Sequence, residues 1–264
     1  MIGKHFENVS LLITHFNRSA SLKRLLNAFK ELQCTFGEIV VSDDCSSSEH
    51  LEKIQRLSTE FDFKLVTTPV NRGLGNNINK GQAAVNKPYT LYVQEDFVPK
   101  AAFPNHFNDA LDLMNLNQDL DIARFYAYFP YANKEPYSKG YDLLIFKWWQ
   151  PGYVKFHYYS DHPHLRRSSF LEKFGQYKEG VNVDVAEYSM VLSFLKNKGK
   201  GILYNEINAL FDQLNNADEP STAAYRKDWK NGSSFFIKVA RQIYLQFKTV
   251  KYHKDLLLFK SKRE

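Results

Sequence analysis

The chain has 264 residues, 24% charged and 44% hydrophobic, a composition that excludes an intrinsically disordered or collagen-like protein. This length can bury one large α/β core or two small ones. Its two cysteines, Cys34 and Cys45, are too few for a disulfide framework or a cysteine metal cluster, which favours a reducing compartment. With no apolar run near the roughly 18 residues of a membrane span and no signal peptide, we expect a cytoplasmic protein.

The net charge of +6 is concentrated at the C-terminal end. Between Arg226 and Glu264 there are eleven Lys or Arg against three Asp or Glu, an excess of +8. The remaining 225 residues therefore carry about −2 (6 minus 8), so the body of the protein needs no polyanionic partner. We expect no binding to nucleic acid.

The first hundred residues alternate between strand and helix patterns. Strands are predicted at residues 9–14, 38–42, 61–65 and 89–93, and helices follow each of the first three. The first helix has an apolar face with i, i+3, i+4 and i+7 spacing, and the second begins with a capping box at Ser46 and Glu49. This alternation predicts a parallel sheet with right-handed crossovers, the nucleotide-binding half of an α/β protein.

The second half of the sequence is less regular. Strands are predicted at residues 121–129, 153–159 and 201–204, with a polar loop at 131–140 and an aromatic turn at 147–152. A short helix near residues 168–174 and an amphipathic helix at 184–197 complete this half.

A boundary is predicted at residues 215–221, beyond which one more helix is expected. Its apolar face would consist of Phe236, Val239, Ala240, Ile243, Phe247 and Val250. We therefore expect a domain over residues 1–215, with a nucleotide-binding half (8–100) and an acceptor half (101–215), and a basic tail over 216–264. The tail is suited to an anionic membrane surface, or to packing on the body or on a second copy in a homodimer.

Two adjacent carboxylates, Glu95 and Asp96, follow the fourth predicted strand directly. Ligands of open α/β sheets bind just beyond the carboxyl ends of the strands, so these groups are placed to meet a substrate. Adjacent like charges are costly unless a cation or a solvated turn relieves them. The alternative is an exposed acidic turn.

Five segments together resemble a known family, the family 2 glycosyltransferases of the GT-A fold. They are Thr14–Arg18 (a T-x-N-R opening), Ser42–Ser46 (V-D-D-G-S), Asn71–Gly81 (N-x-G), Gln94–Asp96 (the metal motif) and Asp184–Leu195 (the helix of the catalytic base). The resemblance covers residues 8–205. It implies inverting transfer of a sugar from a nucleotide-diphosphate sugar, expected to be a UDP-sugar, to an acceptor hydroxyl. Bacterial surface-polysaccharide or glycolipid assembly, at the inner face of the plasma membrane, fits such a body with a basic tail.

The resemblance also assigns nucleotide-binding residues. Asp43 would accept a hydrogen bond from a uracil N–H, whereas Asp44 would bind nucleotide or cap a helix together with Ser46. The full expected set is Thr14, Phe16, Asn17, Arg18, Asp43, Asp44, Asn71, Gly73, Asn79 and Glu95.

A Mg²⁺ or Mn²⁺ ion is implied by the resemblance, because the diphosphate leaving group must be neutralised. Asp96 would bind the metal directly, and Glu95 would support it or contact the ribose. His164 would complete the site or, alternatively, satisfy a local hydrogen bond. Gln94 replaces the first acid of the family motif, which weakens the expected metal site.

The catalytic base implied by the resemblance is Asp184 or Glu187, because the family's second acid falls at Val185. We favour Asp184, since the helix N-terminus favours its ionised form; an N-cap and a solvated helix face are the alternative. Trp148 and Trp149 would stack on an acceptor sugar or fill the core.

One further departure leaves other functions open. The family arginine of the N-x-G segment falls at Ile78, so Arg72 or Lys80 would have to substitute. A non-catalytic nucleotide- or sugar-binding module is consistent with these departures. A sugar nucleotidyltransferase would need a glycine-rich loop after the first strand, and none is present there.

Overall fold

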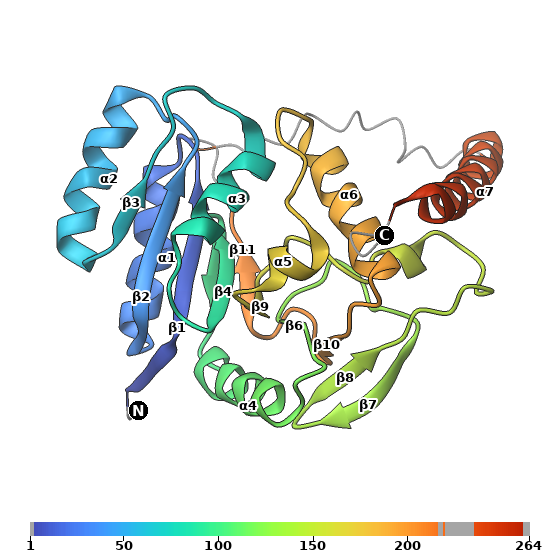
Figure 1. Cartoon of the computed structure of the whole chain (residues 1–264), viewed down its shortest axis with the longest axis horizontal. Helices are drawn as coiled ribbons and strands as arrows, with labels where there is room; N and C mark the ends of the chain where they lie inside the picture. The colour runs from blue at the N-terminus through green and yellow to red at the C-terminus, as the bar shows by residue number, and fades with distance from the viewer. Residues whose placement is uncertain (1–2, 216–218, 220–234, 261–264) are drawn as a thin grey trace.

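The computed structural model describes residues 3–215, 219 and 235–260, and the described part of the chain forms a mixed α/β fold around one large sheet (Figure 1). The nine strands of that sheet follow the order β3-β2-β1-β4-β9-β6-β10-β8-β7. They are β1 (Lys4–His15), β2 (Cys34–Asp43), β3 (Lys64–Val66), β4 (Tyr89–Gln94), β6 (Ile122–Arg124), β7 (Lys134–Ser138), β8 (Tyr141–Leu144), β9 (His164–Arg167) and β10 (Gly201–Tyr204). Strands β5 (Phe97–Pro99) and β11 (Phe211–Gln213) form a separate antiparallel pair.

The helices cover both faces of the sheet. They are α1 (Ser19–Glu31), α2 (Ser48–Phe61), α3 (Gly73–Ala84), α4 (Phe103–Leu116), α5 (Phe170–Phe174), α6 (Val183–Lys196) and α7 (Phe235–Leu258). Two clusters of buried side chains result. Helices α1, α2 and α4 contribute to one, and α3, α5, α6 and α7 to the other.

The parallel half of the sheet agrees with the sequence prediction. Strands β1, β2, β3 and β4 pair in parallel, with β1 between β2 and β4. Successive residues of β1 face opposite sides, so that Leu11 and Ile13 join one cluster while Leu12 joins the other. Burial on both faces explains why the central part of β1, Leu11–Ile13, is apolar without polar alternation.

The second half differs from the prediction in three places. The strand expected at residues 121–129 ends at Arg124: the Phe125 amide still donates to the carbonyl of Pro163 beside β9, but the Ala127 amide donates to the carbonyl of Ile207 instead. The loop expected at 131–140 contains β7, which pairs with β8. The strand expected at 153–159 was wrong, since this segment holds only a short 3₁₀ turn, Val154–Phe156.

The aromatic pattern that suggested a strand at 153–159 has another origin. Phe156, Tyr158 and Tyr159 are buried, but in a loop whose rings pack against α6 and α7. The strand that occupies the middle of the sheet is instead β9, which pairs antiparallel with both β4 and β6. Its polar sequence, His164–Arg167, hid it from pattern analysis.

The later helices and strand β10 agree with expectation. Helix α5 lies within the predicted 168–174, and β10 matches residues 201–204. Helix α6 begins one residue before the predicted start, where the Asn182 side chain accepts a hydrogen bond from the Asp184 amide. This N-cap fixes the direction in which the helix enters the body.

Helix α7 confirms the predicted tail helix. An amphipathic helix that packs on the body would bury its apolar face, but much of the predicted apolar face of α7 is exposed. Tyr252 and Leu256 pack on the body, whereas Ile243, Phe247 and Val250 are 53%, 71% and 67% exposed. The predicted boundary at 215–221 lies mostly outside the described residues. The side chains of Phe236, Val239 and Ala240 also lie outside the described part of the chain. Among the described helices, none combines the length and hydropathy needed to cross a membrane.

Candidate functional site

The carboxyl ends of β1, β2 and β4 meet at one edge of the sheet. Register pairs Thr14 with Ser42 on one side and with Gln94 on the other. The segments that follow these strands therefore lie together, as the position of a ligand site in an open α/β sheet requires. These segments contain the predicted residues 16–18, 43–44 and 95–96.

Asp43 lies at the end of β2 with its side chain fully buried. Its Oδ1 lies 2.8 Å from Nδ1 of His15, and its Oδ2 accepts from the Ser46 amide at 2.9 Å. Although burial alone would raise the pKa of Asp43, the hydrogen bonds from His15 and Ser46 lower it below the usual range. The carboxylate is thus held ionised, and its first role in this structure is to fix the loops after β1 and β2.

Asp44 organises the start of α3 and does not cap α2. Its two carboxylate oxygens accept from the backbone amides of Arg72 and Gly73, at 2.9 and 2.7 Å. Gly73 has φ +81°, a left-handed conformation that glycine adopts without strain, and the Asn71 side chain accepts from the same amide at 3.2 Å. Asp44, Asn71 and Gly73 therefore form one turn at the rim of the site.

The remaining residues expected near the nucleotide are of two kinds: some are half-buried at the rim of the site, and others are buried inside the protein. Phe16 is half-buried, and Asn17 accepts from the Ser47 amide at 2.8 Å, which joins the loops after β1 and β2. Thr14 is buried against the Tyr92 hydroxyl at 3.1 Å. Asn79 is also buried and binds both the amide and the carbonyl of Tyr177 at 2.9 Å, so it holds a loop and does not face the rim.

Glu95 and Asp96 face a cation supplied by the chain itself. Nη1 of Arg18 lies 3.4 Å from Glu95 and 3.5 Å from Asp96, and all three side chains are nearly buried. Burial raises the pKa of Glu95 to about 7, while His15 and Arg18 oppose that rise and Asp96 adds to it. The acidic turn is therefore a buried cluster and not the exposed turn that the sequence left open.

One oxygen of Asp96 is left for a ligand. Oδ2 accepts from the Gln213 side chain at 2.9 Å, whereas the buried Oδ1 has no hydrogen-bond partner among the described residues. A buried carboxylate oxygen without a partner is costly, and a divalent cation is a ligand that relieves it. In the part of the chain that the structure describes, no group of three or more His, Cys, Asp or Glu could hold a metal ion.

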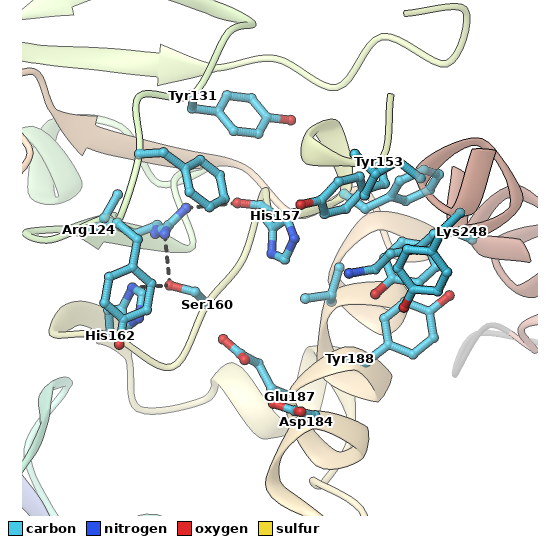
Figure 2. Close-up of a pocket in the computed structure, with 18 of the residues that line it drawn as sticks. Arg124, Tyr131, Tyr153, His157, Ser160, His162, Asp184, Glu187, Tyr188 and Lys248 are labelled. Carbon is cyan, nitrogen blue, oxygen red and sulfur yellow. Dashed lines mark hydrogen bonds between the residues drawn. The ribbon is translucent and has the colours of Figure 1, made fainter. Parts of the chain in front are cut away.

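The structure also contains a cavity of about 590 Å³ (Figure 2), whose lining does not include the acids Glu95 and Asp96. Tyr128 connects the two, because it lines the cavity and donates from its hydroxyl to Gln213, the residue that binds Asp96. The walls come from the segment after β6, the loop at 153–162, α6 and α7. Arg124, His157, Ser160 and His162 lie on one side, as Figure 2 shows.

Glu187 points into this cavity from α6 (Figure 2). Its Oε1 accepts from the Asp161 amide at 3.0 Å, and the Asp161 carbonyl in turn accepts from Gln94 at 3.4 Å. Burial and the neighbouring Asp161 carboxyl raise the pKa of Glu187 to about 7, against the effect of Arg124. A carboxylate with this pKa can take up a proton near neutral pH.

Asp184 also lines the cavity, but it is exposed at the first turn of α6. Of the two predicted bases, Glu187 is the more buried and is held by a backbone hydrogen bond. We therefore propose Glu187 ahead of Asp184, which the sequence favoured, as the candidate base.

Three other predicted site residues lie away from these groups. His164 is fully buried in β9, with its ring 5.4 Å from that of Tyr92 and its Nδ1 2.7 Å from the His162 carbonyl. Burial and Arg166 hold its pKa well below the usual range. Trp148 and Trp149 are 40% and 81% exposed and do not line the cavity; Trp148 contacts His253 of α7.

Several residues of the site were not identified from the sequence. His15, buried between Asp43 and the Arg18 amide, was noted only as part of a motif. Arg124 lies in β6, and its proximity to a cavity had no sequence signal. His162, in the Asp-His-Pro-His run, lines the cavity in place of His164.

A family model, described as "Glycosyl transferase family 2", matches residues 10–179. Poly-beta-1,6-N-acetyl-D-glucosamine synthase of Staphylococcus epidermidis is 30% identical over 92 residues, which is 35% of this chain and 22% of the relative. The chain thus spans less than a quarter of the length of the curated relatives that it matches.

Solved structures share the fold at low identity. A complex of S. aureus TarS 1-349 with UDP-GlcNAc has a TM-score of 0.60 and 14% identity, and the match covers 93% of this chain and 72% of that one. GalNAc-T7 with UDP, GalNAc and Mn²⁺ has a TM-score of 0.54 and 12% identity, with 75% of this chain and 42% of that one covered. Mannosyltransferase PcManGT from Pyrobaculum calidifontis, in complex with GDP-Man and Mn²⁺, has a TM-score of 0.50, with 11% identity over 75% of this chain and 56% of that one.

Proposed function

This chain belongs to glycosyl transferase family 2, and we propose that it transfers a sugar, with inversion, from a UDP-sugar to an acceptor hydroxyl. The observation that carries the proposal is the presence of two separate acid sites, one at the strand ends and one within the cavity, which Tyr128 and Gln213 link. Asp96 lies beside the strand ends where the donor would bind, and Glu187 lies within the cavity where an acceptor would bind. Such a division is what in-line displacement requires.

The donor would occupy the edge formed by the ends of β1, β2 and β4. Asp43, Asp44 and the amides at the start of α3 would surround the nucleoside, and Arg18 and Lys80 would supply positive charge near the diphosphate. Lys80 is half-buried beside the carbonyl of Asp43 and would substitute for the family arginine, whose position is held by Ile78. Gly75 packs against the Lys178 carbonyl so closely that a Cβ there would lie 2.1 Å from it, which holds α3 near this edge.

A divalent cation fits Asp96, whose Oδ1 is buried and unpartnered among the described residues. Mg²⁺ or Mn²⁺ would be held by Asp96 and by the diphosphate oxygens, and when bound it would neutralise the leaving group. Arg18 would have to turn from Asp96 toward the phosphates for this to occur. The structures with GDP-Man and Mn²⁺ and with UDP and Mn²⁺ belong to proteins of the same fold.

Glu187 would act as the general base. Its carboxylate would take the proton of the acceptor hydroxyl while that oxygen attacks the anomeric carbon, and the bond to the diphosphate would break with its electrons on the leaving group. The hydrogen bond from the Asp161 amide aims one oxygen and leaves the other for the acceptor. Asp184, in the first turn of the same helix, would bind the acceptor or stay exposed to solvent.

The outer face of α7 supports association with the inner face of the plasma membrane. Its exposed Ile243, Phe247 and Val250 form one stripe, and residues 235–260 contain six Lys or Arg against one Asp. An apolar stripe between basic residues is the pattern of a helix that lies on an anionic lipid surface. A lipid-linked saccharide in surface-polysaccharide assembly would then reach the cavity from the membrane; a second copy of the chain is the competing occupant.

Calorimetry with UDP and with GDP, each with and without Mn²⁺, tests the proposed function. We expect UDP to bind more tightly than GDP, and Mn²⁺ to strengthen the binding. Failure of both nucleotides to bind under either condition would contradict the proposal. Binding of UDP without any turnover of UDP-sugars would identify a non-catalytic binding module instead.

A further inference from the structure

Asp161 is a buried residue in the loop that leads from the 3₁₀ turn to β9, and its backbone contacts the candidate base. Its amide donates to Oε1 of Glu187 at 3.0 Å, and its carbonyl accepts from Nε2 of Gln94 at 3.4 Å. The cavity lining includes the neighbours Ser160 and His162 but not Asp161, which is 3% exposed. Asp161 therefore contacts the base from the protein side of the cavity wall.

The loop around Asp161 is held on both sides, which fixes the direction of its amide. Before it, Nη2 of Arg124 donates to the Ser160 hydroxyl at 2.7 Å. After it, the Phe125 amide donates to the Pro163 carbonyl at 3.0 Å. Because both flanks are bound to β6 and to the residue that follows it, the amide keeps one orientation toward the base.

Gln94 makes a contact that the acid of the family motif could not make. It is the last residue of β4, and its side-chain amide donates to the Asp161 carbonyl. An ionised carboxylate at this position would only accept hydrogen bonds, so it would repel the carbonyl oxygen. The departure from the family motif thus connects the strand that precedes Glu95 and Asp96 to the loop that aims the base.

The carboxyl group of Asp161 places a second acid beside the base. Its Oδ1 accepts from the Tyr177 hydroxyl at 2.8 Å, and that hydroxyl also contacts the hydroxyl of Tyr159. Burial raises the pKa of Asp161, whereas the two tyrosine hydroxyls and the Arg166 guanidinium oppose that rise. Burial and Asp161 in turn raise the pKa of Glu187 to about 7, because an ionised neighbour makes a second negative charge more costly.

Other charged and titratable groups also face Glu187. Arg124 opposes the rise in its pKa, and Asp184, on the same helix, adds to it. The other walls of the cavity present Tyr128, His157, His162, Arg241, Lys248 and Tyr252. A substitution at Asp161 leaves all of these in place, so it isolates the effect of the one like charge.

We propose that Asp161 is a positioning residue for Glu187, that its backbone amide aims one oxygen of the base while its carboxyl places a like charge beside it, and that Gln94 holds Asp161 in place. This inference rests on the proposed function, because it assigns the support of the base in that reaction. The like charge strengthens the proton affinity of Glu187, so that the base can take the proton of an acceptor hydroxyl near neutral pH.

Titration of the glutamate side-chain carboxyl carbons by ¹³C NMR tests the role of Asp161 in the whole chain, without donor or acceptor. The Glu187 signal is identified by its loss in Glu187→Gln, and its midpoint is expected at about pH 7. Asp161→Asn keeps the backbone amide and an acceptor oxygen for Tyr177, but it removes the charge. Loss of a like charge favours the ionised base, so the midpoint should fall by about one pH unit.

Asp142→Asn is the matched control, because Asp142 is also buried but pairs with Lys134 of β7. The Glu187 midpoint should not move in this variant. In turnover of a UDP-sugar, each chain is compared with its own kcat at pH 8. On that scale Asp161→Asn should be about fivefold more active at pH 6 than the unaltered chain, since about half of its base is then ionised. A substitution that only disturbs the structure would not give this gain.

Gln94→Met tests the contact with the Asp161 carbonyl, since it removes the N–H donor without adding a charge. We expect kcat to fall about two- to tenfold, as loss of one hydrogen bond implies, with KM for the UDP-sugar unchanged. An unchanged kcat, or a change in KM alone, would overturn the role of Gln94.

The two levels of the account fail in different ways. A Glu187 midpoint that stays in place or rises in Asp161→Asn would overturn the role of Asp161 alone, because the titration does not depend on turnover. Absence of turnover of every UDP-sugar by the unaltered chain would instead contradict the proposed function.

Discussion

Replacement of Glu187 by Gln is the substitution that separates the two candidate bases. Gln keeps the size of the side chain and its acceptor oxygen for the Asp161 amide, but it cannot take a proton. General base catalysis contributes about 10²- to 10⁴-fold, so kcat should fall by that factor while UDP affinity is unchanged. The matched variant Asp184→Asn, at the exposed first turn, should retain most of the activity.

The pH dependence of kcat gives a second, independent test of Glu187 as the base. With a pKa of about 7, Glu187 is about 9% ionised at pH 6 and about 91% at pH 8. Because the base must be ionised, kcat should rise about tenfold over this interval, and the rise should be absent in Glu187→Gln. The assay is release of nucleotide from the donor at saturating acceptor. If Asp184→Asn loses activity and Glu187→Gln does not, the assignment of the base is wrong.

Three further predictions concern the donor site, the core and the tail. Asp96→Ala should bind UDP with the same affinity in Mn²⁺ as in its absence, by calorimetry; a retained Mn²⁺ effect would exclude Asp96 as the ligand. Gly81→Ala should lower the free energy of unfolding by about 1–3 kcal/mol in urea titrations, because the new Cβ would lie 2.5 Å from Leu12 and 2.9 Å from Ser42. An unchanged midpoint would contradict the tight packing of α3. Phe247→Asp should reduce co-sedimentation with anionic vesicles, whereas an unchanged fraction together with loss of a dimer would favour a second copy as the occupant.

The parallel half of the fold could be predicted because its signals are local. The central residues of β1, Leu11–Ile13, are apolar and buried on both faces, and α1 has regular helical spacing. The second half could not be predicted in the same way, since β9 is a polar segment, His164–Arg167, whose strand conformation depends on β4 and β6 on either side. Pairing with the neighbouring strands sets the conformation of this segment, and its intrinsic strand propensity does not.

The candidate site also has a part that local sequence signals predict and a part that depends on tertiary contacts. The sequence placed Asp96, Glu187 and Asp184 near the site, because motif spacing carries them to strand ends and a helix start. It could not indicate that Arg18 would contact both Glu95 and Asp96, since the residues are 77 and 78 positions apart. Nor could the hydrophobic pattern of α7 indicate that its polar and aromatic face would turn inward, toward a cavity.

The most direct test of the central claim is turnover of nucleotide sugars by the whole chain. Purified protein would be supplied with UDP-, GDP- and dTDP-sugars, Mn²⁺ and a saccharide acceptor, and release of the nucleotide would be measured. The account predicts release from a UDP-sugar that depends on the acceptor and is lost in Glu187→Gln. Release that is equal in the unaltered chain and in Glu187→Gln, or that occurs with every donor except UDP-sugars, would contradict it.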